Sequence, residues 1–237
     1  MKSESPFARP EVACRYEAWY STPYGALADR IERAMLLELL RPLAPGASVL
    51  DVGCGTGHFA AALADAGFRV AGVDPEPAML SIASQRVPVV CADGLRLPFD
   101  DGAFDAAILV AVLKFVSDPA ALLVEARRVA QHRVVVLALS SRSWLGLRRR
   151  LSGWLGNAVF AQARFRSRAR IIAAAREAGA EPVRIRTALF LPPAIAGRFP
   201  RLEERLSRGN LPCGGILGLA LPGGASPDAA GRGRSLR

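Results

Sequence analysis

The sequence predicts an α/β fold in which a largely parallel β-sheet carries helices on both faces. Short apolar runs that suit buried strands alternate with amphipathic stretches that suit helices, a pattern typical of strand–helix–strand units. A glycine-rich turn follows the first of these apolar runs. The length of 237 residues suits one domain, and a hydrophobic content of 51% is enough for a full core.

The N-terminal part, residues 1–44, is predicted to form a lid and a helix. Residues 1–22 have the composition of an irregular segment rich in aromatic side chains. Thr22 followed by Pro23 is typical of a helix start, because Thr is a good N-cap and proline fits the first helical position. Apolar residues then recur at helical spacing as far as Leu40, which predicts an amphipathic helix.

The central part alternates regularly between strands and helices. The apolar runs predict strands at 48–52, 68–74, 87–93, 106–113 and 133–139. Helices are predicted between them at 58–67, 76–86 and 118–130. This alternation predicts parallel pairing of the strands, because each helix returns the chain to the same end of the sheet.

The C-terminal part is less regular. We expect a capping insert at 140–166, in which tryptophans lie between basic residues, and a disordered tail at 222–237. Between them we predict a helix at 167–179, a strand at 182–190, a short helix at 199–208 and a last strand at 214–221. The main domain is therefore placed at 45–221.

Basic residues are concentrated in one stretch. The formal net charge is +10, and no Asp or Glu occurs from Ala126 to Arg176, where the sequence has twelve arginines. A solvated basic face is the favoured interpretation of this 126–176 stretch. An anionic substrate, RNA and an acidic membrane surface are the alternatives.

The cysteines and the apolar runs indicate the cellular compartment of the protein. The four cysteines are scattered without a CxxC pair, so we expect neither disulfides nor a metal site. No apolar run is long enough to span a bilayer, and the N-terminus lacks the apolar region of a secretory signal. These features predict a cytoplasmic protein.

The stretch SVLDVGCGTGHFA is the most informative motif. Gly53, Gly55 and Gly57 lie between a predicted strand and a predicted helix, where glycines let a ligand approach the backbone. The dinucleotide pattern G-x-G-x-x-G is not matched, since His58 stands in place of its third glycine. Asp51 precedes the turn, where a carboxylate would repel a pyrophosphate but could face the ammonium group of an amino-acid-like ligand.

Two more acidic residues end the next two predicted strands. Asp74 ends the second, where an ionised carboxylate can accept hydrogen bonds from both hydroxyls of a ribose. Asp93 ends the third, where a carboxylate can accept from an adenine amino group. Ligands of open α/β sheets bind at the carboxyl ends of the strands, so the three carboxylates point to one nucleoside-type ligand.

These motifs closely resemble the class I S-adenosylmethionine-dependent methyltransferases. They are most similar to the bacterial small-molecule group (type 11) that includes ubiquinone and menaquinone methyltransferases. The similar segments are VLDVGCGTG, VAGVDPEPAML, CADGLRLPFDDGAFDAAILV and LKFVSDPAALLVEARRV. The resemblance implies a seven-stranded Rossmann-like sheet in the order 3-2-1-4-5-7-6 with strand seven antiparallel, and it implies S-adenosyl-L-methionine as the cofactor.

The resemblance also implies which residues hold the cofactor. The implied set is Asp51, Gly53, Cys54, Gly55, Gly57, Asp74, Pro75, Met79, Asp93, Gly94, Leu95 and Val110. Tyr16, Tyr20 and Tyr24 are candidates for a lid over the substrate, or alternatively one packing stripe of a helix. Lys114 is a weak candidate for binding an anionic substrate or for a general base, and a surface lysine at a strand end is the favoured alternative.

We therefore expect an enzyme that transfers a methyl group from S-adenosylmethionine to a small-molecule acceptor by in-line displacement. The basic and aromatic insert favours an acceptor with a negative group and an apolar part. One alternative is the same chemistry on RNA or protein, with nucleic acid the less favoured partner. The other is a catalytically silent regulator that binds the cofactor.

Overall fold

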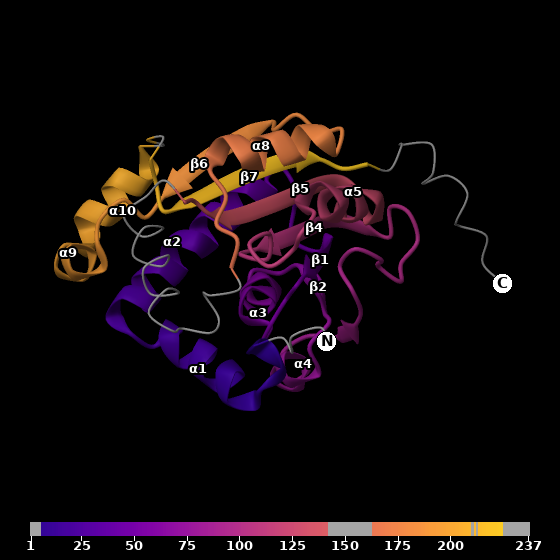
Figure 1. Cartoon of the computed structure of the whole chain (residues 1–237), viewed down its shortest axis with the longest axis horizontal. Helices are drawn as coiled ribbons and strands as arrows, with labels where there is room; N and C mark the ends of the chain where they lie inside the picture. The colour runs from indigo at the N-terminus through magenta and orange to yellow at the C-terminus, as the bar shows by residue number, and fades with distance from the viewer. Residues whose placement is uncertain (1–5, 142–162, 210, 212, 225–237) are drawn as a thin grey trace.

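The fold is described from a computed structural model, which describes residues 6–141, 163–209, 211 and 213–224. A seven-stranded sheet forms its centre, in the order β3-β2-β1-β4-β5-β7-β6 (Figure 1). The strands are β1 (Ser48–Val52), β2 (Arg69–Asp74), β3 (Val89–Cys91), β4 (Phe104–Val110), β5 (Ala130–Leu139), β6 (Arg184–Ala188) and β7 (Ile216–Pro222). Strands β1 to β5 pair in parallel, and β7 runs antiparallel to both of its neighbours. The predicted sheet order and the antiparallel seventh strand are confirmed.

Helices cover both faces of the sheet (Figure 1). The helical segments are η1 (Pro6–Ala8), α1 (Pro10–Tyr20), α2 (Pro23–Leu40), α3 (His58–Asp65), α4 (Pro77–Ala83), α5 (Pro119–Val129), α8 (Arg168–Glu177), α9 (Pro193–Arg198) and α10 (Pro200–Arg208). Helices α2 and α3 pack on one face, and α5 and α8 pack on the other. Val49 and Leu50 of β1 accordingly point into opposite core layers, which explains why the strand is apolar throughout.

The helix starts follow the capping signals of the sequence. The Thr22 hydroxyl accepts a hydrogen bond from the Gly25 N–H at 3.0 Å, directly before α2. The Asp118 carboxylate accepts from the Ala121 N–H at 3.0 Å, directly before α5. The predicted N-cap Thr22 is therefore confirmed, and Asp118 caps α5 in the same way, because each side chain satisfies a backbone donor that the first helical turn leaves free.

Of two predictions in the less regular parts of the chain, the first was wrong, and the second was confirmed by α10 but missed the helix before it. The segment expected to be irregular contains α1, whose contacts come from residues far along the chain rather than from a strong pattern of its own. The helix expected at 199–208 is preceded by a separate helix, α9. Phe199 separates α9 from α10 with φ −127° and ψ 60°, because the residue before a proline is disfavoured in the helical region.

The expected capping insert at 140–166 and tail at 222–237 fall largely outside the described residues. Among the helices that are described, none combines the length and the apolar content needed to cross a bilayer.

Candidate functional site

The glycine-rich turn joins the carboxyl end of β1 to the start of α3. Gly53, Gly55 and Gly57 have φ values of +73°, +55° and +77°, a region that other residues rarely adopt. A Cβ atom on Gly53 would lie 2.5 Å from Cγ2 of Val112, whereas a Cβ on Gly55 would meet nothing within 4 Å. The turn therefore contacts the loop after β4 on one side and leaves open space at Gly55.

Two carboxylates border this turn. Oδ2 of Asp74 accepts a hydrogen bond from the Gly55 N–H at 2.9 Å, and Oδ1 accepts from the Glu76 N–H at 2.9 Å. Asp51 is only 2% exposed, and its Oδ1 atom has no hydrogen-bond partner among the described residues. Burial and the charge of Asp74 raise the pKa of Asp51 to about 7, and burial also raises the pKa of Asp74.

This arrangement fits a ligand that brings a positive charge to Asp51. A buried polar atom without a partner is rare in native proteins, and a buried carboxylate is costly unless a donor or a cation compensates it. The ammonium group of an amino-acid-like ligand supplies both. The residues present therefore fit the methionine part of S-adenosylmethionine.

Cys54 lies in the turn, but its side chain packs beneath it against Leu80 and Ala83 of α4. A Cβ on Gly72 would come within 2.7 Å of the Cys54 sulfur, so the missing side chain of that glycine makes room for the thiol. Burial raises the pKa of the Cys54 thiol, which keeps it neutral. Any contribution of this residue to ligand binding therefore comes from its backbone.

The loop after β3 carries three more of the predicted residues. Oδ1 of Asp93 accepts a hydrogen bond from the Leu95 N–H at 2.9 Å, and both side chains are exposed. A Cβ on Gly94 would lie 2.9 Å from Cδ1 of Leu122, so this glycine lets the loop approach α5 closely. The loop thus presents an open carboxylate at the same edge of the sheet as Asp74.

The remaining predicted residues lie at the ends of β2 and β4. Pro75 is exposed directly after β2, Met79 is buried in α4, and Val110 is the partly buried last residue of β4. Ala111 follows with φ +56°, and its N–H donates to the Leu137 carbonyl at 2.7 Å. A non-glycine residue in this region is strained, which is a feature often found at functional sites.

Helix α1 carries two of the three lid candidates. The Tyr20 hydroxyl donates to the Tyr16 hydroxyl at 3.0 Å, and the Tyr20 ring stacks on His58 with ring centroids 3.6 Å apart. Burial raises the pKa of Tyr16 to about 12, and the charge of Asp51 adds to the rise. Tyr24 lies on α2 instead and packs against the core. The Trp19 ring contacts both Tyr20 and Tyr24, at centroid distances of 5.0 Å and 6.5 Å, so the three tyrosines lie on two helices but belong to one aromatic cluster.

Sequence reasoning missed the residue that attaches α1 to the turn. Oε1 of Glu17 accepts a hydrogen bond from the hydroxyl of the fully buried Thr56 at 2.5 Å. Oε2 of Glu17 forms an ion pair with Arg86 at 2.5 Å, and Arg86 also donates to the Thr56 carbonyl at 3.0 Å. Burial opposes the charge of Glu17, but the bonds from Arg86 and Thr56 lower its pKa. The position of Glu17 beside Tyr16 in the predicted lid was the available signal.

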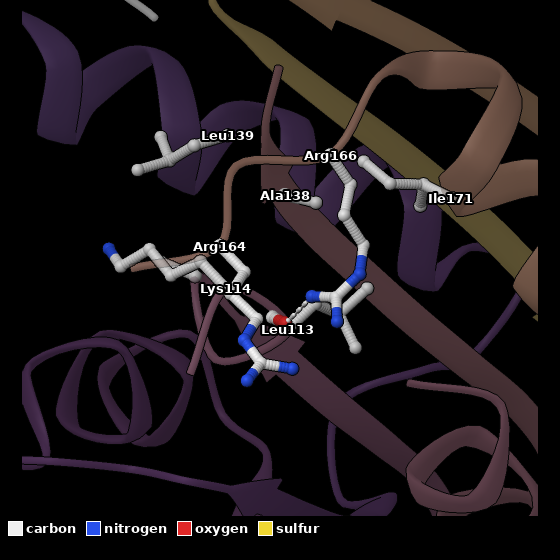
Figure 2. Close-up of a pocket in the computed structure, with 8 residues that line it drawn as sticks. Leu113, Lys114, Ala138, Leu139, Arg164, Arg166 and Ile171 are labelled. Carbon is white, nitrogen blue, oxygen red and sulfur yellow. Dashed lines mark hydrogen bonds between the residues drawn. The ribbon is translucent and has the colours of Figure 1, made fainter. Parts of the chain in front are cut away.

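Lys114 lines a separate pocket beyond β4 and β5 (Figure 2). We call it the basic pocket, because Arg164 and Arg166 also line it. Its apolar lining consists of Ala111, Leu113, Ala138, Leu139 and Ile171. Sequence reasoning singled out neither arginine, and the absence of acidic residues from 126–176 was the only signal.

Comparison with known proteins identifies the domain. A family described as a methyltransferase domain matches residues 50–137. An uncharacterized methyltransferase of Mycobacterium avium is 40% identical over a match of 135 residues, and the match covers 52% of this chain and 51% of that protein. The chain spans about half the length of the curated relatives it matches first.

Two solved structures share the fold. A methyltransferase from Thermotoga maritima superposes with a TM-score of 0.68 at 24% identity, covering 91% of this chain and 97% of that one. Geranyl diphosphate C-methyltransferase from Streptomyces coelicolor, solved with Mg²⁺, geranyl diphosphate and S-adenosyl-L-homocysteine, has a TM-score of 0.60 at 18% identity, covering 81% and 78%. The family match contains the glycine turn together with Asp51, Asp74 and Asp93, so residues 50–137 are a methyltransferase domain, and the two solved methyltransferases share the fold of the chain.

Proposed function

We propose that the chain binds S-adenosylmethionine at the carboxyl ends of β1, β2 and β3 and transfers its methyl group to a small-molecule acceptor. The observation that carries this proposal is the buried Asp51 carboxylate, whose Oδ1 lacks a partner among the described residues beside a turn that is open at Gly55. A ligand with a cationic amino-acid group pairs with the Asp51 carboxylate and occupies the open space at Gly55.

The residues around the glycine turn and at the neighbouring strand ends each contact a different part of the cofactor. Asp51 binds the ammonium group, and the backbone of the turn surrounds the methionine part. Each carboxylate oxygen of Asp74 accepts one backbone hydrogen bond and keeps capacity for another, which the two ribose hydroxyls use. Asp93 accepts from the adenine amino group, with Leu95 beside the ring and Met79 packed below.

When bound, S-adenosylmethionine supplies an electrophilic methyl group on a positively charged sulfonium. The sulfur–carbon bond breaks as the bond to the acceptor forms, so the chain has to align the two groups and exclude water. Val112 closes the turn at Gly53, and α1 is attached over the turn by Glu17. These contacts provide alignment, and no general base is assigned.

A small acceptor is favoured over RNA or protein by a solved enzyme of the same fold, and the basic pocket is where we place part of that acceptor. The solved enzyme for geranyl diphosphate shows that this fold accommodates such acceptors. The proposal includes a cytoplasmic location and a division into a lid and helix (1–44), a methyltransferase domain (45–221) and a tail.

The test is calorimetric titration of the chain with S-adenosylhomocysteine. We expect micromolar binding that weakens at least about tenfold in Asp74→Asn, because the variant loses acceptor capacity toward the ribose. Asp105→Asn is the matched control, since its carboxylate also accepts a backbone hydrogen bond, from Ser48 at 2.7 Å, but at the opposite end of β1. Failure of the wild type to bind would overturn the proposal.

An acceptor screen with labelled S-adenosylmethionine then tests turnover. Methyl transfer to a small molecule is the expected result. Cofactor binding without turnover on any small molecule, RNA or protein would instead favour the catalytically silent regulator.

A further inference from the structure

The basic pocket combines two guanidinium groups with an apolar wall. Figure 2 shows the Arg164 and Arg166 side chains extending toward Leu113 and Lys114, with Leu139 on one side of them and Ile171 on the other. The Arg164 N–H donates to the Lys114 carbonyl at 2.7 Å, so this arginine is fixed to the loop by its backbone.

Arg166 gives the pocket a rigid side. Its guanidinium donates to the carbonyls of Leu113 at 2.5 Å and Val116 at 2.9 Å, which ties the loop to the segment before α8. The partial negative charges of these two carbonyl oxygens offset only part of the positive charge of Arg166. Burial, followed by the like charges of Arg164 and Arg170, lowers the pKa of Arg166.

Little negative charge balances this region. Among the described residues, Arg164 and Arg166 form no ion pair with an acidic side chain. Asp118 does act on Arg166, but its carboxylate already accepts from the Ala121 N–H as the cap of α5. Two like charges held near each other favour an anion between or beside them.

The pocket and the glycine turn share one loop. Ala111 lines the basic pocket, and the next residue, Val112, contacts Gly53 of the turn. The pocket and the glycine turn therefore border the same loop, so a molecule held in the pocket lies next to the loop that also packs against the turn. This loop is the strained one, with φ +56° at Ala111.

We propose that the basic pocket binds the anionic group of the methyl acceptor, a carboxylate or a phosphate ester, through Arg164 and Arg166. The buried apolar residues that line the pocket, among them Leu139 and Ile171, limit its size, so the rest of the acceptor lies outside it. Arginine suits this task, because its planar group donates two parallel hydrogen bonds to carboxylate and phosphate alike. The inference rests on the proposed function for the reaction, but the anion site itself needs no cofactor.

The test uses three probes with one apolar tail: octyl phosphate, octanoate and octanol. Each is titrated calorimetrically into the full cofactor-free chain. We expect the two anions to bind at least about tenfold more tightly than the alcohol. In Arg164→Gln, the affinity for each anion should fall about tenfold. Arg201→Gln, an exposed arginine on α10, should leave it unchanged.

Equal affinity for the anions and for the alcohol would overturn the proposal. Equal anion affinity in Arg164→Gln and Arg201→Gln would overturn it as well. The octyl phosphate and octanoate arms decide which anion is preferred. Arg166 is not the primary variant, because its loss also releases the loop. Titration of the wild type with S-adenosylhomocysteine separates the two proposals: anion binding without cofactor binding would refute the proposed function and leave the anion site standing. Arg164→Gln should bind S-adenosylhomocysteine as the wild type does.

Discussion

The carboxylate of Asp74 accepts a hydrogen bond from the N–H of Gly55 at 2.9 Å, so the end of β2 determines the shape of the turn after β1. The Val73 carbonyl adds to this by accepting from the N–H groups of Gly53 and Cys54 at 2.7 Å and 3.0 Å. The turn is therefore formed by pairing with the neighbouring strand, and its shape does not depend on a ligand.

Gly55→Ala should abolish cofactor binding at little cost in folding. The new Cβ meets no protein atom, so it fills the open space where we place the methionine part. Gly46→Ala is the matched control, because Gly46 also has a positive φ and open surroundings but precedes β1. Both variants should lose about 1 kcal/mol of unfolding free energy to backbone strain. Only Gly55→Ala should lose calorimetric binding of S-adenosylhomocysteine, and equal binding by both would contradict the site.

Asp51→Asn should stabilise the cofactor-free chain at high pH. The pKa of Asp51 rises from 3.8 to about 7, so the folded state holds a proton that the unfolded state has released between these values. Stability of the wild type therefore falls as the pH rises through that window, and an asparagine removes the fall. The advantage of the variant in urea unfolding should grow by about 2–4 kcal/mol between about pH 4 and pH 8.

Asp105→Asn should change the stability in the opposite direction, and it serves as the comparison. Burial opposes the charge of Asp105, but its bonds from Ser48 lower its pKa. That carboxylate stabilises the fold above its ordinary pKa, so the variant should be less stable than the wild type at neutral pH. If the free energies of unfolding of Asp51→Asn and of the wild type changed in parallel with pH, Asp51 would be ionised across the whole pH range of the measurement.

Cofactor binding should release protons near neutral pH. With a pKa of about 7, Asp51 is about half protonated in the free chain, and an ammonium beside it favours the ionised form. Titrations with S-adenosylhomocysteine in two buffers of different ionisation enthalpy should therefore report release of about half a proton at pH 7. The same pair of titrations on Asp51→Asn identifies the source. A release that persists in the variant would assign the proton to another group.

Glu17→Gln should loosen α1 from the turn. The substitution removes the ion pair with Arg86 and weakens the acceptor of the Thr56 hydroxyl, while the helix keeps its sequence pattern. Amide hydrogen exchange of residues 10–20 should speed up by about tenfold, with a loss of about 1 kcal/mol in global stability. Glu11→Gln, in the exposed first turn of the same helix, should change neither. Equal exchange in both variants would contradict this role of Glu17.

The central sheet was predictable because its strands are buried on both sides. Val49 and Leu50 enter different core layers, so β1 had to be a continuous apolar run, and its glycine turn followed directly in the sequence. The capping residues Thr22 and Asp118 act within their own helices, which makes them visible to local reasoning. The carboxylates at the strand ends were visible because parallel strands end at one edge.

What could not be predicted depends on contacts between distant segments. Glu17 meets Thr56 and Arg86 only after α1 has packed over the turn. Arg164 and Arg166 become a pair in a pocket only because the chain returns from the insert to the loop after β4. In the sequence they were two among twelve arginines of a basic stretch.

The antiparallel strand β7 has a consequence for biosynthesis. It comes last among the described strands, yet it lies inside the sheet between β5 and β6, and β6 pairs with no other strand. While residues 216–222 are still within the ribosome, β5 is an open edge and β6 has nothing to pair with. The parallel half that holds the glycine turn can form early, but the sheet of the emerging chain keeps an unpaired edge at β5 until β7 inserts.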